Sequence, residues 1–261
     1  MEAVTNSKPF TGKTIVVTRP AHQAGELAAW IRDAGGTPII FPVIEIVDVA
    51  DPRPLIDLIA RLDEFDLAIF ISPNAASKAM PLIASHGTLP ASLKIAAIGK
   101  GGARELEKFG VRNIIVPPLR FDSEGLLAMP ELQNVSGWRV VIFRGDGGRE
   151  LLGDTLRARG ASVDYAACYR REKPIASAQP LLEAWQQNKL SAIAVTSSEG
   201  LHNLAAMLGQ SGLALLEKTP LFVPHPRIAE TARELGLTEV ILTPPTDAGL
   251  LEGLIAYFNL S

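Results

Sequence analysis

The chain has 261 residues, 25 lysine and arginine residues against 28 aspartate and glutamate residues, and a formal net charge of −3. With 47% hydrophobic and 20% charged residues, the composition is that of a folded protein with a large core, which excludes a disordered chain. The small negative charge argues against nucleic-acid binding, which needs a basic face. The length exceeds that of a typical single domain, so we expect two domains.

The cysteine count and the N-terminal residues exclude further classes of protein. A single cysteine, Cys168, excludes an internal disulfide and a cysteine-based metal site. The first ten residues lack the apolar segment of a signal peptide, and no run approaches the about 20 apolar residues that cross a bilayer. We therefore expect a cytoplasmic protein without membrane contacts.

Short apolar runs alternate along the chain with amphipathic helical segments. Several runs are nearly continuous in Val, Ile, Leu and Ala, which is typical of strands covered by helices on both faces. The alternation predicts an α/β fold with parallel sheets. In chain order, the predicted strands are 14–18, 37–47, 67–72, 94–98, 113–116, 139–143, 162–169, 192–196, 221–223 and 239–242.

The same order of segments occurs twice in the chain. Four segments of the first half resemble four of the second, in one order and at a nearly constant offset, which predicts two similar α/β domains. The pairs are 12–41 with 137–166 (offset 125), 68–79 with 192–203 (offset 124), 98–118 with 224–244 (offset 126), and the stretches near Asp122 and Asp247.

Two long extended stretches, 37–49 and 162–174, occupy equivalent places in the repeat and exceed the usual strand of about 5–6 residues. We interpret each as a strand that continues into a linker between the domains. Tandem domains divided near residue 130 are the alternative. The expected domains are a discontinuous one, 1–44 plus 172–261, and an inserted one, 45–171, with linkers near 40–49 and 164–174.

Eight loops follow predicted strands, four in each repeat, and each one opens a helix. Ligands of parallel α/β domains bind beyond the carboxyl ends of the strands. Helix N-termini present unpaired N–H groups and partial positive charge, which attract anions. Ordinary helix caps are the alternative for any single loop. Together, the loops predict a cleft between the domains that suits a carboxylate-rich ligand.

The standard catalytic and nucleotide-binding motifs are absent from the sequence. It contains no GxxxxGK[ST], GxGxxG, HExxH or GxSxG, and its four histidines are scattered, so we expect no metal site. Arg19, Arg144 and Arg149 lie at strand ends beside helix starts and are candidate carboxylate ligands, with surface ion pairs as the alternative.

The ordered motifs VTRP, ISPNA, IGKGGA, DSEGLL, RGDGGRE, TSSEGL and LTP resemble those of the uroporphyrinogen-III synthase family over roughly residues 12–258. The resemblance implies two flavodoxin-like domains with parallel sheets, one of them discontinuous, joined by a two-stranded linker. It also implies a cyclising hydro-lyase that needs no metal or organic cofactor. Its substrate would be hydroxymethylbilane, which loses water and closes with inversion of ring D.

The resemblance also implies roles for particular residues. Tyr169 matches a tyrosine proposed to assist loss of the substrate hydroxyl and is the candidate catalytic residue. Because Pro226 has no N–H, carboxylate binding by the helix start at residues 225–226 is in doubt. The expected substrate-binding residues are Arg19, Ser72, Asn74, Gly99, Lys100, Ser123, Arg144, Arg149, Ser197, Ser198 and His225.

Other functions remain open from the residues alone. One alternative is a non-catalytic two-domain binding or sensor protein for an anionic metabolite. Another is a flavodoxin-like electron carrier, which would bind FMN. For the synthase, we expect a monomer that makes at most transient contact with the synthase that precedes it in the same synthesis.

Overall fold

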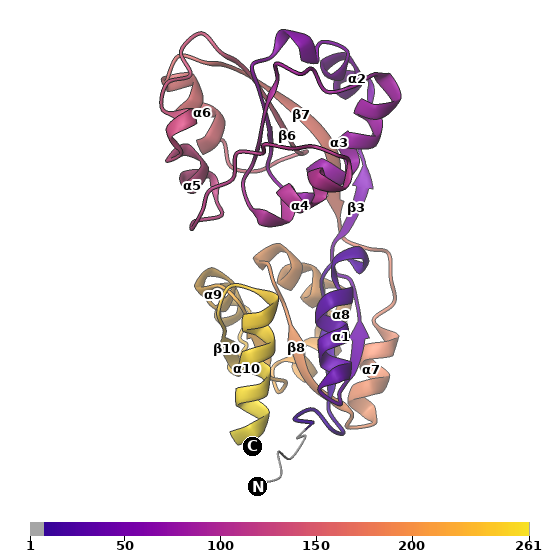
Figure 1. Ribbon diagram of the computed structural model, residues 1–261. Helices are drawn as coiled ribbons and strands as arrows, with labels where there is room; N and C mark the ends of the chain where they lie inside the picture. Colours follow the sequence, from indigo (N-terminus) through magenta and orange to yellow (C-terminus); the bar gives the residue numbers. More distant parts are fainter. Residues whose placement is uncertain (1–7, 261) are drawn as a thin grey trace, which may run out of the picture. The chain divides into compact units, whose positions relative to one another are not determined.

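The computed structural model describes residues 8–260 and divides the chain into two compact units, each built around its own five-stranded sheet (Figure 1). Unit 1 comprises Met1–Glu45 and Glu172–Ser261, and unit 2 comprises Ile46–Arg171. No helix within residues 8–260 is long and apolar enough to cross a membrane.

The sheet of unit 1 is parallel throughout. Its strand order is β10-β9-β8-β1-β2. Counted along unit 1 alone, this order is 2-1-3-4-5 read from the other edge, the doubly wound arrangement of flavodoxin-like domains. Its strands are β1 (Thr14–Val17), β2 (Thr37–Ile40), β8 (Leu190–Ala194), β9 (Leu221–Val223) and β10 (Val240–Leu242).

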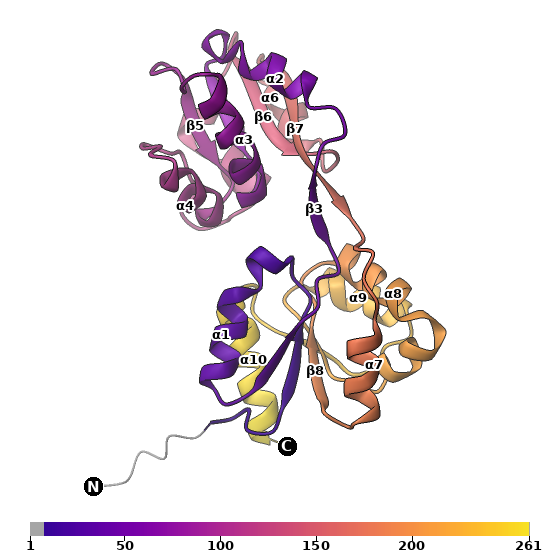
Figure 2. The same cartoon turned by 90° about the vertical axis from the view of Figure 1, so that its right-hand side faces the viewer.

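Helices cover both faces of this sheet. Because side chains alternate along a strand, Ile15 and Val17 of β1 enter one apolar cluster and Val16 enters the other. Helices α1 (Gly25–Asp33) and α10 (Asp247–Leu260) pack side by side on the first face (Figure 2). The other face carries α7 (Gln179–Gln186), α8 (Ser198–Leu216) and α9 (Pro226–Glu234).

The sheet of unit 2 has the order β3-β7-β6-β4-β5. Strands β4 and β5, β4 and β6, and β6 and β7 pair in parallel. A single bridge between Ala96 and Ile115 continues the pairing beyond β5. The strands are β3 (Glu45–Asp48), β4 (Leu67–Phe70), β5 (Lys94–Ala97), β6 (Arg139–Gly145) and β7 (Ser162–Glu172).

Unit 2 repeats the two covered faces of unit 1. Its helices α5 (Ser123–Leu127) and α6 (Leu151–Ala158) bury Leu126 and Leu156 on one face. Helices α2 (Arg53–Ile59), α3 (Pro73–His86) and α4 (Lys100–Lys108) cover the other.

The internal repeat is visible in the backbone. Gly35 and Gly160 follow α1 and α6 with φ of +88° and +90°, and Gly110 and Gly236 follow α4 and α9 with φ of +82° and +81°. Left-handed φ at the end of a helix favours glycine, so these positions are the same turn built twice.

One part of the repeat alignment is wrong by one residue. Ser72 and Ser197 are the N-caps of α3 and α8, and each accepts a hydrogen bond from the N–H three residues later. They are therefore equivalent at an offset of 125, whereas the offset of 124 paired Ser72 with Thr196. Short apolar strands do not specify their register, and the cap geometry decides it.

Two predicted strands also differ from the structure. The stretch 37–47 is divided into β2, which pairs with β1 in the sheet of unit 1, and β3, which belongs to the sheet of unit 2, with Pro42 between them. The stretch 113–116 forms only the bridge at Ile115. Asn113 has a φ of +55° and Pro117 follows, so a regular strand cannot continue there.

The loop before α5 closes tightly on the start of the helix. A Cβ on Gly125 would lie 1.8 Å from the Arg120 carbonyl oxygen, and one on Gly249 would lie 2.5 Å from the equivalent Pro244 carbonyl oxygen. Both positions require glycine because backbone cannot move aside as a flexible side chain can.

We predict that Gly125→Ala lowers the stability of unit 2 by about 2 kcal/mol, because the added methyl group forces this loop open. Urea unfolding measures the change, with Trp138 as the reporter in a Trp30→Phe, Trp185→Phe background. Gly147→Ala is the matched control, since a Cβ there meets nothing within 4 Å. Equal unfolding midpoints for the two variants would contradict the close approach.

Candidate functional site

Most of the predicted site residues lie where the strands of each unit end and the next helix begins. In unit 2, Ser72 follows β4, Gly99 follows β5 and Arg144 is the last residue but one of β6. In unit 1, Ser197 follows β8 and His225 follows β9. The topology thus brings residues that are distant in sequence to the carboxyl edge of one sheet in each unit.

The two serine caps are equivalent and half-buried. The Oγ of Ser72 accepts from Ala75 N–H at 3.1 Å, and the Oγ of Ser197 accepts from Gly200 N–H at 2.9 Å. A hydroxyl accepts with its lone pairs and keeps its own proton available for a further acceptor. Each cap can therefore donate to a carboxylate without releasing its helix.

Tyr169 lies in a bulge of β7. The register shifts between Arg144 and Gly145 of β6, so that Gly145 pairs with Tyr169 and Cys168 is left between two pairs. The shift places Cys168 and Tyr169 in the same apolar cluster, although successive residues of a regular strand face opposite ways. The Tyr169 hydroxyl lies 3.0 Å from Ser72 Oγ.

The Tyr169 side chain is also fully buried. Its exposed fraction is 0%, and Ser72, its hydrogen-bond partner, is half-buried. A Cβ on Gly145 would lie 3.0 Å from the tyrosine ring, so glycine makes room for it. The buried hydroxyl therefore meets Ser72 Oγ instead of solvent.

Arg144 is buried and paired within unit 2. Only 7% of its side chain is exposed, and its Nη1 donates to Glu150 Oε1 at 2.9 Å. The guanidinium lies 4.6 Å from the centre of the Tyr165 ring, and its Nη2 lies beneath the backbone of Gly148. Arg144 thereby contacts the inner side of the loop 146–150 and does not project into solvent.

Glu150 and Tyr165 shift each other's pKa in opposite directions. The nearby Tyr165 hydroxyl and then the Arg144 guanidinium hold the pKa of Glu150 below its usual range. Burial, and after it the Glu150 carboxylate, raises the pKa of Tyr165. The Tyr165 hydroxyl is close to Glu150 but is buried beside Gly153 without a well-formed hydrogen bond.

Arg19 of unit 1 is equivalent to Arg144 but has a different partner. It forms an ion pair with Asp247 at the start of α10, and the two side chains are 26% and 17% exposed. Burial raises the pKa of Asp247 against the opposing effect of Arg19. The Nε of Arg19 is buried without a partner.

Gly99 and Lys100 lie against the loop before α5. Gly99 is the N-cap of α4, in extended backbone, and a Cβ there would lie 3.2 Å from Cβ of Phe121. Lys100 is exposed, and its Nζ lies 5.2 Å from the centre of the Phe121 ring. Both residues of the predicted site thus meet an aromatic side chain that the prediction omitted.

The remaining predicted residues make internal contacts. Asn74 and Ser123 are each 8% exposed, in the first turns of α3 and α5. Ser198 Oγ accepts from the Thr231 hydroxyl at 2.9 Å, which joins α8 to α9. The ring Nδ1 of His225 accepts from Arg227 N–H at 3.2 Å and caps α9, so this nitrogen already has a donor.

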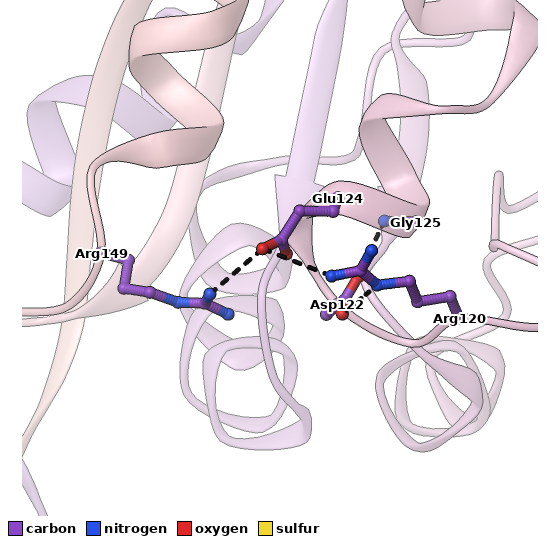
Figure 3. Close-up of polar contacts among 5 residues, drawn as sticks. All are labelled: Arg120, Asp122, Glu124, Gly125 and Arg149. Carbon is purple, nitrogen blue, oxygen red and sulfur yellow. Dashed lines mark hydrogen bonds and ion pairs between the residues drawn. The ribbon is translucent and has the colours of Figure 1, made fainter.

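Arg149 belongs to a cluster of charged residues that the prediction did not contain as a whole. Figure 3 shows Glu124 between Arg120 and Arg149, with Asp122 and Gly125 beside them. Glu124 Oε1 lies 3.4 Å from Arg149 Nη1 and 3.4 Å from Arg120 Nη2. Arg120 and Glu124 are in the PPLRFDSEG loop, but sequence alone does not place that loop beside residue 149.

Among residues 8–260, no three His, Cys, Asp or Glu side chains gather in a way that could hold a metal ion. The groups at the strand ends are instead hydroxyls, guanidiniums and helix N–H groups. This is a donor set for anions, above all for carboxylates.

Comparison with known proteins supplies the family. A family model described as uroporphyrinogen-III synthase HemD matches residues 25–252. The chain belongs to this family. The uroporphyrinogen-III synthase of Escherichia coli strain K12 is 35% identical over 236 residues, which cover 90% of this chain and 96% of that protein. The Synechococcus elongatus uroporphyrinogen-III synthase is 32% identical over 255 residues, covering 94% and 95%.

Solved structures of uroporphyrinogen III synthases share the fold. A mutant enzyme from Thermus thermophilus matches with a TM-score of 0.61 at 20% identity, over 95% of this chain and 100% of that one. The Helicobacter pylori enzyme matches with a TM-score of 0.58 at 16% identity, over 95% and 100%. The predicted α/β fold class and the resemblance to the uroporphyrinogen-III synthase family are confirmed.

We predict that the stabilising effect of Glu150 depends on pH. Because folding lowers its pKa, its contribution is present above the ordinary carboxyl pKa of about 4.3 and is lost as the pH falls through the lowered value. The difference in urea midpoint between the protein and Glu150→Gln should be constant from pH 8 to about pH 5 and shrink below about pH 4. Glu107→Gln, which removes an exposed carboxylate elsewhere in unit 2, is the control. A difference that persists at pH 3 would show that Glu150 acts by packing alone.

Proposed function

We propose that the protein is a uroporphyrinogen-III synthase that cyclises hydroxymethylbilane with loss of water and inversion of ring D. The observation that carries the proposal is the family match over residues 25–252. In this reaction the terminal hydroxyl leaves as water, and the cation that remains is attacked by the substituted carbon of ring D. The bond between that carbon of ring D and the methylene bridge to ring C then breaks, and the free carbon of ring D attacks the same methylene. The attacking carbon loses its proton as the pyrrole is restored, which balances the proton taken up when water leaves.

The protein contributes mainly position to this reaction. The linear tetrapyrrole is flexible and carries eight carboxylates, and it closes without help to the isomer that keeps ring D uninverted. Holding the chain so that one attack is productive lowers the entropic part of the barrier. Ser197, the α4 N-terminus at Gly99 and the side chains of Lys100 and Arg149 supply donors for those carboxylates.

Tyr169 acts in this proposal as a positioning residue for Ser72. The buried phenol hydrogen-bonds to Ser72 Oγ, which is half-buried at the start of α3. With the phenol as donor, the serine proton is directed outward, where it can assist departure of the substrate hydroxyl. The candidate catalytic role of Tyr169 is thereby exerted through Ser72.

Arg144 and Arg19 support the site and do not bind the substrate in this proposal. Arg144 supports the loop 146–150, and Arg19 fixes the start of α10 through Asp247.

We further propose that units 1 and 2 are the discontinuous domain and the inserted domain that the sequence predicts. A cytoplasmic monomer, in transient contact with the preceding synthase, also belongs to the proposal.

The first prediction from this function concerns the product. With hydroxymethylbilane generated in situ by its synthase, the protein should direct the ring closure to isomer III. Oxidation to porphyrins and chromatographic separation of isomers I and III measures the ratio, with heat-denatured protein as the control. Isomer I alone from the folded protein would overturn the synthase and favour a binding protein for an anionic metabolite.

The second prediction concerns the Tyr169–Ser72 pair. Tyr169→Phe should lower kcat about tenfold with little change in KM, because only the hydroxyl is lost. Ser72→Ala should lower kcat by at least as much, and the double variant no further than Ser72→Ala, since the tyrosine acts through the serine. Tyr257→Phe, which removes the phenol bonded to Glu239 in unit 1, is the matched control. Multiplying effects in the double variant would show that Tyr169 acts independently.

A further inference from the structure

Arg120 is held in place by the backbone of its own loop. Asp122 accepts from Gly125 N–H at 2.8 Å as the N-cap of α5, and it also accepts from Arg120 Nε at 2.5 Å (Figure 3). The Arg120 carbonyl returns close to Gly125, where an added Cβ would lie 1.8 Å from its oxygen. The guanidinium is therefore oriented before any ligand arrives, although 62% of the side chain is exposed.

Glu124 is held much more loosely between Arg120 and Arg149. Its Oε1 lies 3.4 Å from each guanidinium, whereas charge-assisted hydrogen bonds are usually about 2.7–2.9 Å long. Its Oε2 is buried and has no hydrogen-bond partner. Thus Oε1 is shared between two guanidinium groups, and Oε2 makes no hydrogen bond.

The fold does not require this Glu124 triad of Arg120, Glu124 and Arg149. The equivalent loop of unit 1 keeps the cap, because Thr246 Oγ1 accepts from Gly249 N–H at 2.9 Å, and it keeps the required glycine. At the equivalent positions of unit 1, the triad is replaced by Pro244, Ala248 and Ala24. The backbone closes equally well without these charges, so they serve something other than folding.

The same loop exposes apolar surface beside its cation. Leu119 is 89% exposed and Phe121 is 45% exposed, on either side of Arg120. A carboxylate bound between the two arginines would therefore place the body of its ligand near an alkyl and an aromatic side chain. This combination suits an acidic side chain attached to a flat apolar ring.

We propose that Arg120 and Arg149 form a clamp for one carboxylate of the tetrapyrrole, and that Glu124 occupies the clamp until the substrate replaces it. The proposal rests on the proposed function and assigns one substrate contact to unit 2. A substrate carboxylate can offer both oxygens to the two guanidiniums, which the Glu124 carboxylate does not do. Glu124 then moves toward solvent, and its unpaired oxygen becomes hydrated.

The effect of removing the Glu124 charge on ligand binding distinguishes a structural role for Glu124 from its replacement by the substrate. If Glu124 orients the two arginines, removing its charge weakens ligand binding. If it competes for them, removing its charge strengthens binding, since the clamp is then empty and more positive. Exposed ion pairs of this kind contribute modestly, so we expect Glu124→Gln to tighten binding about threefold to tenfold.

The test measures binding of a porphyrin octacarboxylate by fluorescence and KM for hydroxymethylbilane, at low and high salt. Glu124→Gln should lower both constants. Arg149→Gln and Arg120→Gln should raise them about fivefold to tenfold with kcat nearly unchanged. These differences should shrink in 1 M salt, because the clamp is exposed to solvent. Glu131→Gln and Arg112→Gln, which remove exposed charges elsewhere in unit 2, are the matched controls.

The outcomes separate this proposal from the function on which it rests. If the protein forms isomer III but Glu124→Gln binds the porphyrin more weakly or equally, the clamp is overturned and the synthase stands. If isomer III is absent but the variants shift porphyrin affinity as stated, the clamp stands as a tetrapyrrole site without that activity. If the unsubstituted protein does not bind the octacarboxylate, the clamp is overturned. Circular dichroism of each variant shows that it is folded.

Discussion

Parallel strands deliver the chain to helix starts at one edge of each sheet, and those starts carry N–H groups that the helix cannot satisfy. The protein meets this constraint with short acceptors at equivalent places in both units. Ser72 and Ser197 cap α3 and α8 through their hydroxyls, and His225 caps α9 through its ring. The same groups that complete the helices form the donor-rich edge, so the edge proposed to bind carboxylates follows from the way the sheets are built.

The two arginines of the RGDGGRE motif at this edge are held differently. Arg144 is buried, paired with Glu150 at 2.9 Å and stacked against Tyr165, which makes it part of the framework of its loop. Arg149, five residues later, is 64% exposed and meets Glu124 only at 3.4 Å. Burial and bond length distinguish the two arginines, although both come from the same RGDGGRE motif. One motif thus contains a buried arginine that supports its loop and an exposed arginine that is only loosely paired.

The bulge in β7 shows how one residue of slippage creates a polar contact inside a core. Regular alternation would turn either Cys168 or Tyr169 away from α3. With the extra residue, both face the same cluster, and the phenol reaches Ser72. Gly145 opposite the bulge leaves space for the ring. The contact between a strand residue and a helix cap 97 positions earlier depends on this irregularity.

The sequence by itself determined the α/β class, the repeat, the positions of most strands, and the family. These follow from local hydrophobic periodicity, turn residues and the order of motifs, which are written along the chain. Tertiary structure alone decided the register of the second repeated segment, the division of 37–47 at Pro42, the burial of Tyr169 and Arg144, and the grouping of Arg120, Glu124 and Arg149. Each of these depends on which residues meet across a sheet or between loops. Such pairings are set by the packing of distant segments, so no local pattern encodes them.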